Sequence, residues 1–396
     1  MLSLGNNISS TQAVEAKYSA NFDGTNDYID TGHHFSDVFN DSFTISFWAK
    51  PDDGQPAGTL YFFGTNDSND DILRAEHKSD GKFVLLLEGN TDTGSFTTNS
   101  PVFSDSAATS WTHILISVTK PGSGNSSAVI YINGSSVAIS TSSISHSNHA
   151  LFSSAQNLVI CARNNQGTVA GFYAGGMDEW ALWNVALDAN AAAAIYNGGS
   201  PLNLTFNQGN YDNSSALQAY YRMGNGLFDD KANGIIHDQD NPGFGINLWD
   251  GANGDVTNWS PFGNNTVEED DGTLKFTYVD NSAGPYIYLR DAYHLSDDLV
   301  VGATYELSIT TKVNTGSVAW RLQHNSYPTY SFPSLTSTDF VTQSETFIAT
   351  TAASHYLFVA AFGTGEIVWV KDITVRKLNG NPGLTSGGPT FSSDTP

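Results

Sequence analysis

The stretch FTISFWAK, residues 43–50, decides the fold class because its apolar and polar side chains alternate. Phe43, Ile45 and Phe47 share one side of an extended chain, and the residues between them share the other. A two-residue period of this kind predicts a β-strand with one face toward a core. The stretches WTHILISVT (111–119) and AVIYINGSSVAI (128–139) repeat the pattern.

Turn and helix signals complete this first β region, which we place at residues 17–199. Asn133-Gly134 interrupts an apolar alternation and predicts a two-residue hairpin, because both turn positions tolerate positive φ. The stretch LDANAAAAIYNGG (187–199) predicts a helix. Asp188 is its expected N-terminal cap and Gly198 its left-handed C-terminal residue.

The composition of the whole chain is that of an all-β protein. The 396 residues include 37 glycines, and 12% are aromatic and only 14% charged. Such a composition favours many short strands joined by polar turns. We expect an N-terminal arm (1–16), a connector with few strands (200–245), a second β region (246–378) and a flexible or docked tail (379–396). The sequence thus predicts two jelly-roll or β-sandwich domains joined by an irregular connector.

The chain is strongly acidic, with 40 acidic against 16 basic residues and a formal net charge of −24. Such a polyanion is repelled by nucleic acid and by anionic membrane surfaces. No stretch approaches the ~20 apolar residues that span a bilayer. We therefore expect neither a nucleic-acid partner nor membrane insertion.

The cysteine count and the N-terminus bear on where the protein works. Cys161 is the only cysteine, so no intrachain disulfide can form. The start, MLSLGNNISSTQ, has neither the basic nor the apolar region of a secretory signal. A secreted-type composition without an export signal favours a virion protein, made in the host cytoplasm and released by lysis. Another export route or a removed leader is the alternative.

The first β region resembles the laminin-G-like, concanavalin A-like jelly roll. The resemblance rests on ordered signatures, namely FDGTNDYIDTG, FTISFWAKPD, WTHILISV, IYINGSSV and GGMDEWALWNVALDANAAAAIYNGG. The alanine-rich final helix departs from the family, which often has acidic residues there.

The second β region is similar to jelly rolls of the carbohydrate-binding-module type, through NWSPFG, TYELSITTKV and VWVKDITVRKL. The module order, with YYRMGNG between the two regions, resembles virion surface proteins of tailed marine phages. That resemblance implies a tail-fibre adhesin or a head (capsid) decoration. The implied partners are other virion subunits in an oligomeric assembly, and host surface glycans.

Motifs for catalysis are absent from the sequence. Concanavalin A-like glycosidases carry Glu-x-Asp-x-x-Glu, which places acid and nucleophile on one strand, and this chain has no such motif. Gly-x-Ser-x-Gly, phosphate-binding-loop and paired-histidine metal motifs are missing as well. We therefore expect a protein that is not an enzyme.

Calcium is the only cofactor that the sequence suggests, because Asp- and Asn-rich loops supply the oxygens that this cation prefers. The resemblance implies that the opening and closing strands of the first region lie together and can bind calcium. Carried onto this sequence, the ligands are Asp23, the Gly24 carbonyl and Asp178. Asp372 is the corresponding candidate in the second region. A merely local hydrogen-bonding role is the alternative for Asp178.

Candidate glycan contacts lie in SVAWRLQHNSYPTY (317–330). Alternation places Trp320 on the opposite face from Arg321 and Gln323, and we assign Trp320 to the core. Sugars present C–H patches and hydroxyl pairs, which suit aromatic and planar polar groups. Arg321, Gln323, Tyr327 and Tyr330 are therefore the predicted contacts, with an ordinary outer face as the alternative. The remaining tryptophans considered, Trp48, Trp180, Trp183 and Trp369, lie inside strand patterns and are interpreted as packing residues.

Three functions remain open at this point. The leading hypothesis is a non-enzymatic virion surface protein with glycan- or protein-binding jelly rolls. A bacterial extracellular adhesin, or an accessory module of a polysaccharide-degrading enzyme, is the alternative, against which the initial Met1 argues mildly. A lyase or hydrolase on the same fold is the third, although it lacks the expected carboxylate motif.

Overall fold

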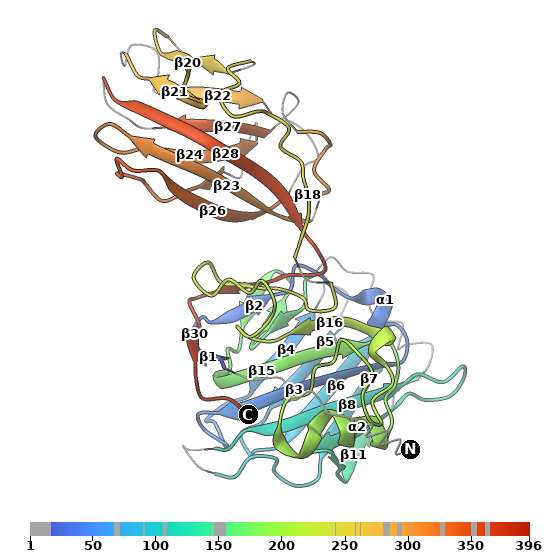
Figure 1. Ribbon diagram of the computed structural model, residues 1–396. Coiled ribbons are helices and arrows are strands. Elements are labelled where there is room, and N and C mark those ends of the chain that lie inside the picture. The colour runs from blue at the N-terminus through green and yellow to red at the C-terminus, as the bar shows by residue number, and fades with distance from the viewer. Residues whose placement is uncertain are drawn as a thin grey trace, which may run out of the picture. The chain divides into compact units, whose positions relative to one another are not determined.

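The computed structural model describes residues 17–66, 72–89, 92–105, 109–142, 144–145, 156–241, 243–257, 259–261, 263–279, 286–290, 295–301, 303–324, 329–349, 355–360 and 365–396. The chain divides into two compact units. Unit 1 comprises residues 1–243 together with 380–396, and unit 2 comprises residues 244–379 (Figure 1). Both units consist of mainly antiparallel sheets, so the predicted all-β fold class is confirmed.

Unit 1 is a sandwich of two sheets, each with one face on a common core. In sheet 1, the described strands follow one another as β10 (Ser135–Ser136), β9 (Ser127–Ile132), β8 (Thr112–Thr119), β3 (Phe43–Pro51), β15 (Ala174–Trp183), β1 (Ser19–Asp23) and β30 (Thr390–Ser392), with β16 (Leu217–Tyr221) also paired to β15. In sheet 2, they follow one another as β11 (Ile139–Ser142), β7 (Asp92–Thr98), β6 (Phe83–Gly89), β5 (Ile72–His77), β4 (Leu60–Asn66), β12 (Val159–Ile160), β2 (Tyr28–Asp30), β29 (Gly383–Ser386) and β17 (Ile235–Ile236), and the hairpin β13 (Arg163–Asn165) and β14 (Thr168–Ala170) joins β4.

The alternation read from the sequence explains the core between these sheets. Phe43, Ile45 and Phe47 of β3 are fully buried in one apolar cluster with Phe62 of β4 and Leu85 of β6. Removing side chains of this size from water contributes about 1.5–3 kcal/mol each. The predicted strand 43–50 and its core face are therefore confirmed.

The outer face of sheet 1 is covered by a segment that follows β15 in the chain. Helix α2 (Ala189–Tyr196) is capped by Asp188, whose side chain accepts a hydrogen bond from the Ala191 N–H at 2.9 Å. Gly198 is left-handed at φ 66°, as predicted, and Asn197 before it is also left-handed at φ 48°, a conformation that asparagine tolerates. The helix and the segment through η1 (Asn197–Gly199) and η2 (Ser214–Ala216) form a second apolar cluster with Trp183.

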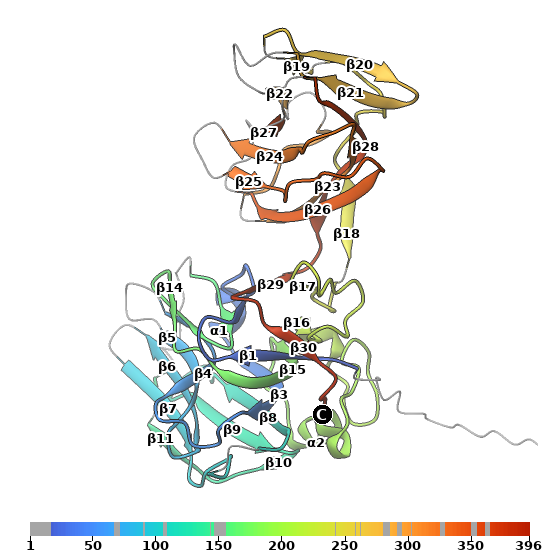
Figure 2. The same ribbon diagram turned by 90° about the vertical axis from the view of Figure 1, so that its left-hand side faces the viewer.

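The C-terminal segment returns to unit 1 and extends both of its sheets. Strand β30 pairs with β1, and β29 lies between β2 and β17 (Figure 2). Residues 200–243, predicted as a connector, contribute β16 and β17 to the same unit. Unit 1 thus includes the predicted connector and the C-terminal segment. The limits of unit 2 at 244 and 379 lie within two residues of those expected at 246 and 378, whereas the residues on both sides of 199 belong to unit 1. The remaining helix of the described part, α1 (Ser36–Phe39), buries Val38 and Phe39 in the core.

Unit 2 is a smaller sandwich. Sheet 3 contains β20 (Thr266–Asp270), β21 (Thr273–Thr277), β28 (Ile367–Leu378), β23 (Thr304–Val313) and β26 (Val341–Ile348) in spatial order, with β18 (Phe244–Asn247) also paired to β28. Sheet 4 contains β19 (Ser260–Pro261), β22 (Tyr286–Arg290), β27 (His355–Ala360), β24 (Ala319–His324) and β25 (Thr329–Ser331). Trp320 is fully buried in the core of this unit, as predicted.

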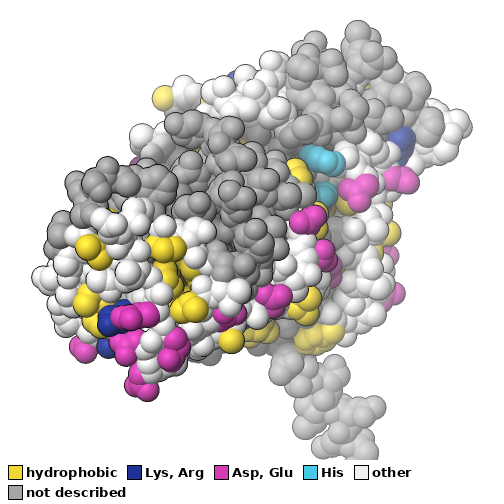
Figure 3. Space-filling view, turned by 90° about the horizontal axis from the view of Figure 1, so that it is seen from above, with side chains coloured by type: hydrophobic (Ala, Val, Ile, Leu, Met, Phe, Trp, Pro, Cys, Tyr) yellow, Lys and Arg dark blue, Asp and Glu magenta, His cyan; other side chains and the backbone are white. Residues whose placement is uncertain are grey.

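Among the described helices, none has the length and apolarity needed to cross a bilayer. On the face drawn in Figure 3, acidic side chains (magenta) recur while basic ones (dark blue) are few, in line with the net charge of −24.

Candidate ligand-binding site

The predicted calcium ligands of unit 1 are not brought together. Strands β1 and β15 do pair, but Asp23 lies opposite Ala174, which is separated from Asp178 by roughly 13 Å of strand. Asp23 closes a local turn instead, accepting hydrogen bonds from Thr25 N at 2.7 Å and Asn26 N at 3.4 Å. Gly24, at φ 73°, is the left-handed residue of that turn.

Asp178 belongs to a buried charge network at a bulge in β15. The register with β3 shifts between Asp178 and Ala181, and Glu179 adopts a left-handed φ of 49°. Glu179 accepts a hydrogen bond from Arg222 Nε at 3.1 Å and another from the Tyr220 hydroxyl. Burial, together with the neighbouring Glu179 charge, raises the pKa of Asp178 well above its usual value.

The same network ties the C-terminal segment to unit 1. Asp229 accepts hydrogen bonds from the backbone N–H groups of Gly224, Gly226 and His237 at 2.7–2.9 Å, and burial raises its pKa to about 6. Asp238 accepts from the backbone of Tyr220 and, at 3.2 Å, of Asn381, and burial raises its pKa to about 7. Asp238 is buried and Asp229 is half-buried, and both carboxylates accept backbone hydrogen bonds that hold loops.

Asp372 lies at a strand irregularity in unit 2. Its φ is 50°, and its side chain and backbone N–H exchange two hydrogen bonds with the Asn253 amide, each 2.8 Å long. Within the part of the chain that the structure describes, no three His, Cys, Asp or Glu side chains gather as they would around a metal ion. Calcium binding stays a prediction at each of the predicted positions.

The predicted glycan contacts of unit 2 are placed only in part. Arg321 is half-buried on β24, opposite Ser331 of β25. Gln323 and Tyr330 lie on the same strand pair, where the backbone alone is described, and Tyr327 lies outside the described residues. The structure neither gathers these side chains into a site nor separates them.

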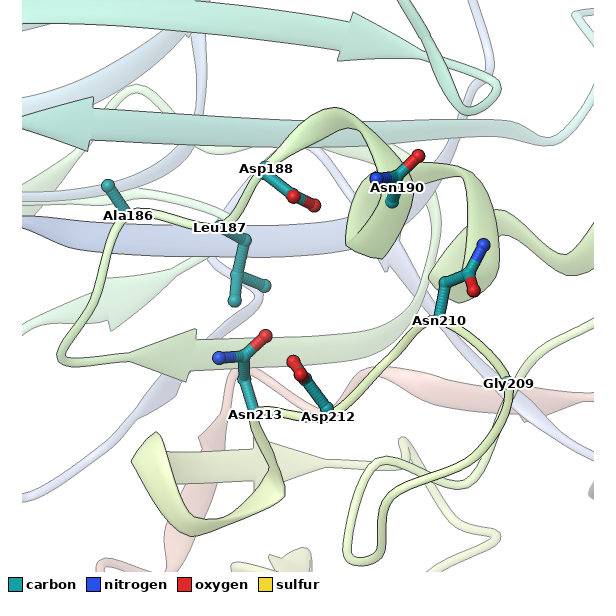
Figure 4. Close-up of a pocket in the computed structure, with 8 residues that line it drawn as sticks. All are labelled: Ala186, Leu187, Asp188, Asn190, Gly209, Asn210, Asp212 and Asn213. Atoms are coloured by element: carbon teal, nitrogen blue, oxygen red, sulfur yellow. The ribbon is translucent and has the colours of Figure 1, made fainter.

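A polar cleft of about 430 Å³ lies beside α2 in unit 1. Asp188 and Asn190 line it from the start of the helix, and Asn210, Asp212 and Asn213 line it from the loop before η2 (Figure 4). In Figure 4 Asp188 at the helix start and Asp212 and Asn213 of the loop point toward one space, and Asn190 and Asn210 lie at its edge. Asp188 is engaged in capping, whereas the other four side chains make no hydrogen bond within the described chain.

The cleft presents carboxamide and carboxylate groups toward a ligand. An Asn side chain both donates and accepts hydrogen bonds, and a carboxylate accepts them. Ligand pockets of about 300–1,000 Å³ are usually lined by apolar groups, so this polar lining suits a ligand with many hydroxyls better than an apolar one. Reasoning from the sequence missed the cleft, because the residues from Asn210 to Asn213 read as an irregular connector.

A second feature that the sequence interpretation missed is the outward-facing Trp369 of unit 2. Val368 and Val370 point into the core, whereas Trp369 is only half-buried on the outer face of sheet 3. The Lys312 ammonium lies 4.9 Å from its ring centroid and 4.6 Å from that of Phe340. Trp369 therefore lies inside a strand as predicted and packs on the outer face of sheet 3 rather than in the core, opposite the two valines of VWVKD.

Comparison with known proteins supports the nature of the first unit. Residues 23–193 match the family described as the concanavalin A-like lectin/glucanases superfamily. This part of the chain is thus similar to concanavalin A-like jelly-roll domains, in agreement with the resemblance seen in the sequence. A search of curated proteins gives no match.

Solved structures with similarity to the chain include carbohydrate-binding modules. The CBM40 module of the Ruminococcus gnavus IT-sialidase shares 13% identity at a TM-score of 0.36, covering 46% of this chain and 99% of the module. A putative carbohydrate binding protein from Bacteroides ovatus ATCC 8483 shares 15% identity at a TM-score of 0.37, covering 56% of this chain and 55% of that protein. A family 29 carbohydrate-binding module shares 12% identity at a TM-score of 0.26, covering 33% of this chain and 83% of the module. Sequence identities and TM-scores this low do not indicate which ligand this chain binds.

Proposed function

We propose that the chain is a non-catalytic glycan-binding protein and that the polar cleft beside α2 holds a sugar. The observation that carries the proposal is the set of four polar side chains that surround the cleft without hydrogen-bonding to the described chain. Vicinal sugar hydroxyls can pair with such groups as both donors and acceptors. The match of this unit to a superfamily of lectins and glucanases supports the same class of ligand.

Binding rather than catalysis is favoured by the placement of the carboxylates. Asp188 is committed to the helix cap, and the buried pair Asp178 and Glu179 has exposures of 0% and 4%. A glycosidase needs two carboxyl groups that flank a substrate bond, about 5–5.5 or 6.5–9.5 Å apart. A reducing-sugar assay on marine polysaccharides tests this part of the proposal, and steady release of reducing ends would overturn it.

We propose a virion surface as the setting, with the chain made in a host cytoplasm and assembled with other subunits as an oligomer. The module order and the secreted-type composition support this setting. Immunogold labelling of intact particles tests it, since label at the tail tip indicates an adhesin and label over the head indicates a decoration. Failure to label any particle would favour a bacterial adhesin or an accessory module instead.

The cleft is tested with Asp212→Asn, which removes a charged acceptor but keeps the side chain's shape. We expect the labelled protein to bind a subset of a glycan array, and the variant to bind those glycans about 10- to 100-fold more weakly. Asp105→Asn is the matched control, because it makes the same charge change at an exposed side chain outside the cleft. Equal binding by both variants would remove the cleft from the proposal.

A further inference from the structure

An arginine without an anionic partner among the described residues lies on the outer face of sheet 2. The Arg163 guanidinium sits 4.9 Å from the centroid of the Tyr61 ring, and the Arg74 guanidinium sits 5.9 Å from it. Core residues Leu73 and Ala75 flank Arg74 in β5, so Arg74 points away from the core. The two arginines and the tyrosine therefore form one cluster, which we call the arginine face.

Two glycines make this arrangement possible. A Cβ on Gly64 would lie 3.0 Å from the Arg74 Cβ and 3.1 Å from the Arg163 Cβ, so only glycine lets both side chains approach over β4. A Cβ on Gly171 would lie 2.3 Å from the Tyr61 ring, so this glycine packs directly against it. The ring and the guanidinium are thus held by backbone geometry rather than by flexible surface contacts.

The charges of the arginine face are unevenly satisfied. Glu76 pairs with Arg74 at 2.6 Å and with Lys78 at 3.1 Å, and only 4% of Glu76 is exposed. Arg163 has neither an ion pair nor a hydrogen bond from its side chain within the described ranges, and its Nε is buried without a partner there. A guanidinium carries five N–H donors and no acceptor, so the buried Nε of Arg163 calls for an acceptor from another group.

Stacking on Tyr61 offsets part of the cost of burying the Arg163 side chain. An unpaired buried donor in a native protein calls for an explanation, and a ligand acceptor is one that fits a guanidinium. Arginine forks bind carboxylates with two parallel hydrogen bonds. The Tyr61 ring is only 9% exposed, so it supports the guanidinium from the protein side and leaves the fork to the ligand.

We propose that the arginine face binds the carboxylate of an acidic sugar, with Arg163 as the ion-pairing residue. The inference rests on the proposed glycan-binding function and names its ligand class at a second position, separate from the cleft beside α2. A single carboxylate suits this face because the Arg163 guanidinium pairs with no described carboxylate. A ligand with one isolated negative charge also meets less repulsion from a chain of net charge −24 than a polyanion does. A nucleic acid, with one charge at every phosphate, would be repelled by the rest of such a surface.

The test uses the full chain on a glycan array printed in two forms, one native and one with every carboxylate converted to a methyl ester. We expect binding to carboxylated glycans that disappears on esterification. Arg163→Gln should weaken this binding about 10- to 100-fold, and Arg163→Lys should weaken it less, because the charge remains but the fork is lost. Lys82→Gln is the control, since it makes the same charge change where a lysine already pairs with Asp80.

Each outcome decides between the two proposals. Retained binding by Arg163→Gln, or binding that survives esterification, would overturn the arginine face. Binding of neutral glycans alone, lost in Asp212→Asn, would overturn the arginine face and leave the cleft in place. Binding of no glycan in either form would overturn both. Melting temperatures of all variants close to that of the parent chain would exclude unfolding as the cause of any loss.

Discussion

Unit 1 covers the outward aromatic residues of sheet 1, whereas unit 2 leaves the outward Trp369 of sheet 3 partly open. Trp48 and Trp183 both point away from the core of the unit 1 sandwich, yet their exposures are 4% and 0%. Trp48 stacks on Tyr196 of α2 at 5.7 Å, and Trp183 lies in the cluster beneath the segment after α2. Trp369 of unit 2 has the Lys312 side chain over its ring instead. The comparison shows that alternation sets which face a residue points to, while distant segments set whether that face is buried.

The largest effect should follow from removing the segment that closes unit 1. Deleting residues 380–396 takes away β29 and β30, and with them the contacts of Asp238 to Asn381 and of Lys50 to Asp394 at 2.5 Å. We expect the melting temperature of unit 1 to fall by more than about 10 °C. The deletion should cost several kcal/mol, which is a large part of the stability of an ordinary domain, and each kcal/mol lowers the melting temperature of a domain of this size by about 2–4 °C. The transition of unit 2 should stay in place, because its sheets contain no described strand from this segment. Calorimetry on the full and shortened chains measures both, and an unchanged unit 1 transition would contradict the assignment of the tail.

The next largest effect separates the two kinds of outward tryptophan. Trp183→Ala should lower the free energy of unfolding of unit 1 by about 3–5 kcal/mol, because it opens a cavity and removes the hydrogen bond that the Tyr211 hydroxyl accepts from Nε1 at 3.0 Å. Trp369→Ala is the matched change in unit 2 and should cost about 1–2 kcal/mol, since half-buried surface and the hydrogen bond from Trp369 Nε1 to Asp270 Oδ2 at 2.8 Å are lost without a cavity. Urea titrations monitored by circular dichroism measure both values. Equal losses would mean that Trp369 is as well covered as Trp183.

Trp183 and Trp369 also show which features could be predicted from the sequence and which could not. The period in residues 43–50, the helix over 187–199 and the burial of Trp320 were predictable, because each depends on neighbours close in the chain. The cover over Trp183 depends on residues 187–217, and the closure of unit 1 depends on residues 380–396. No local pattern encodes such pairings. Asp23 and Asp178 illustrate the same limit, because their strands pair as expected but in a register that keeps the two carboxylates apart.

A third prediction contrasts the units by pH. Asp229 and Asp238 have pKa values raised by burial to about 6 and about 7, against 3.8 in an unfolded chain. The folded state therefore holds more protons between about pH 4 and pH 7, so the free energy of unfolding of unit 1 should fall as pH rises through this window. The total loss should be a few kcal/mol, because each tenfold difference in proton affinity between the folded and unfolded states corresponds to about 1.36 kcal/mol.

Chemical denaturation at pH 5 and pH 8 measures this dependence for each transition. Asp238→Asn removes the titrating group while an amide oxygen can still accept from Tyr220 N, so the variant should show a flatter profile. Asp372→Asn is the control, because Asp372 is exposed and lies in unit 2. A unit 1 transition that grows more stable toward pH 8 would show that these carboxyl groups are ionised in the folded state at pH 5.

The smallest effect tests whether lysine is the cover of Trp369. Lys312 lies over two rings at 4.6 and 4.9 Å, and a cation above an aromatic face contributes about 0.5–1 kcal/mol at an exposed site. Lys312→Met keeps the length of the side chain and removes its charge, so it should lower the stability of unit 2 by that amount and change the fluorescence of Trp369. Lys377→Met makes the same charge change at an exposed position of the same strand as Trp369 and should do neither. If Lys312→Met and Lys377→Met have the same effect, the Lys312 ammonium does not stabilise the Trp369 ring. The ring would then be covered by apolar packing of the Lys312 methylene groups.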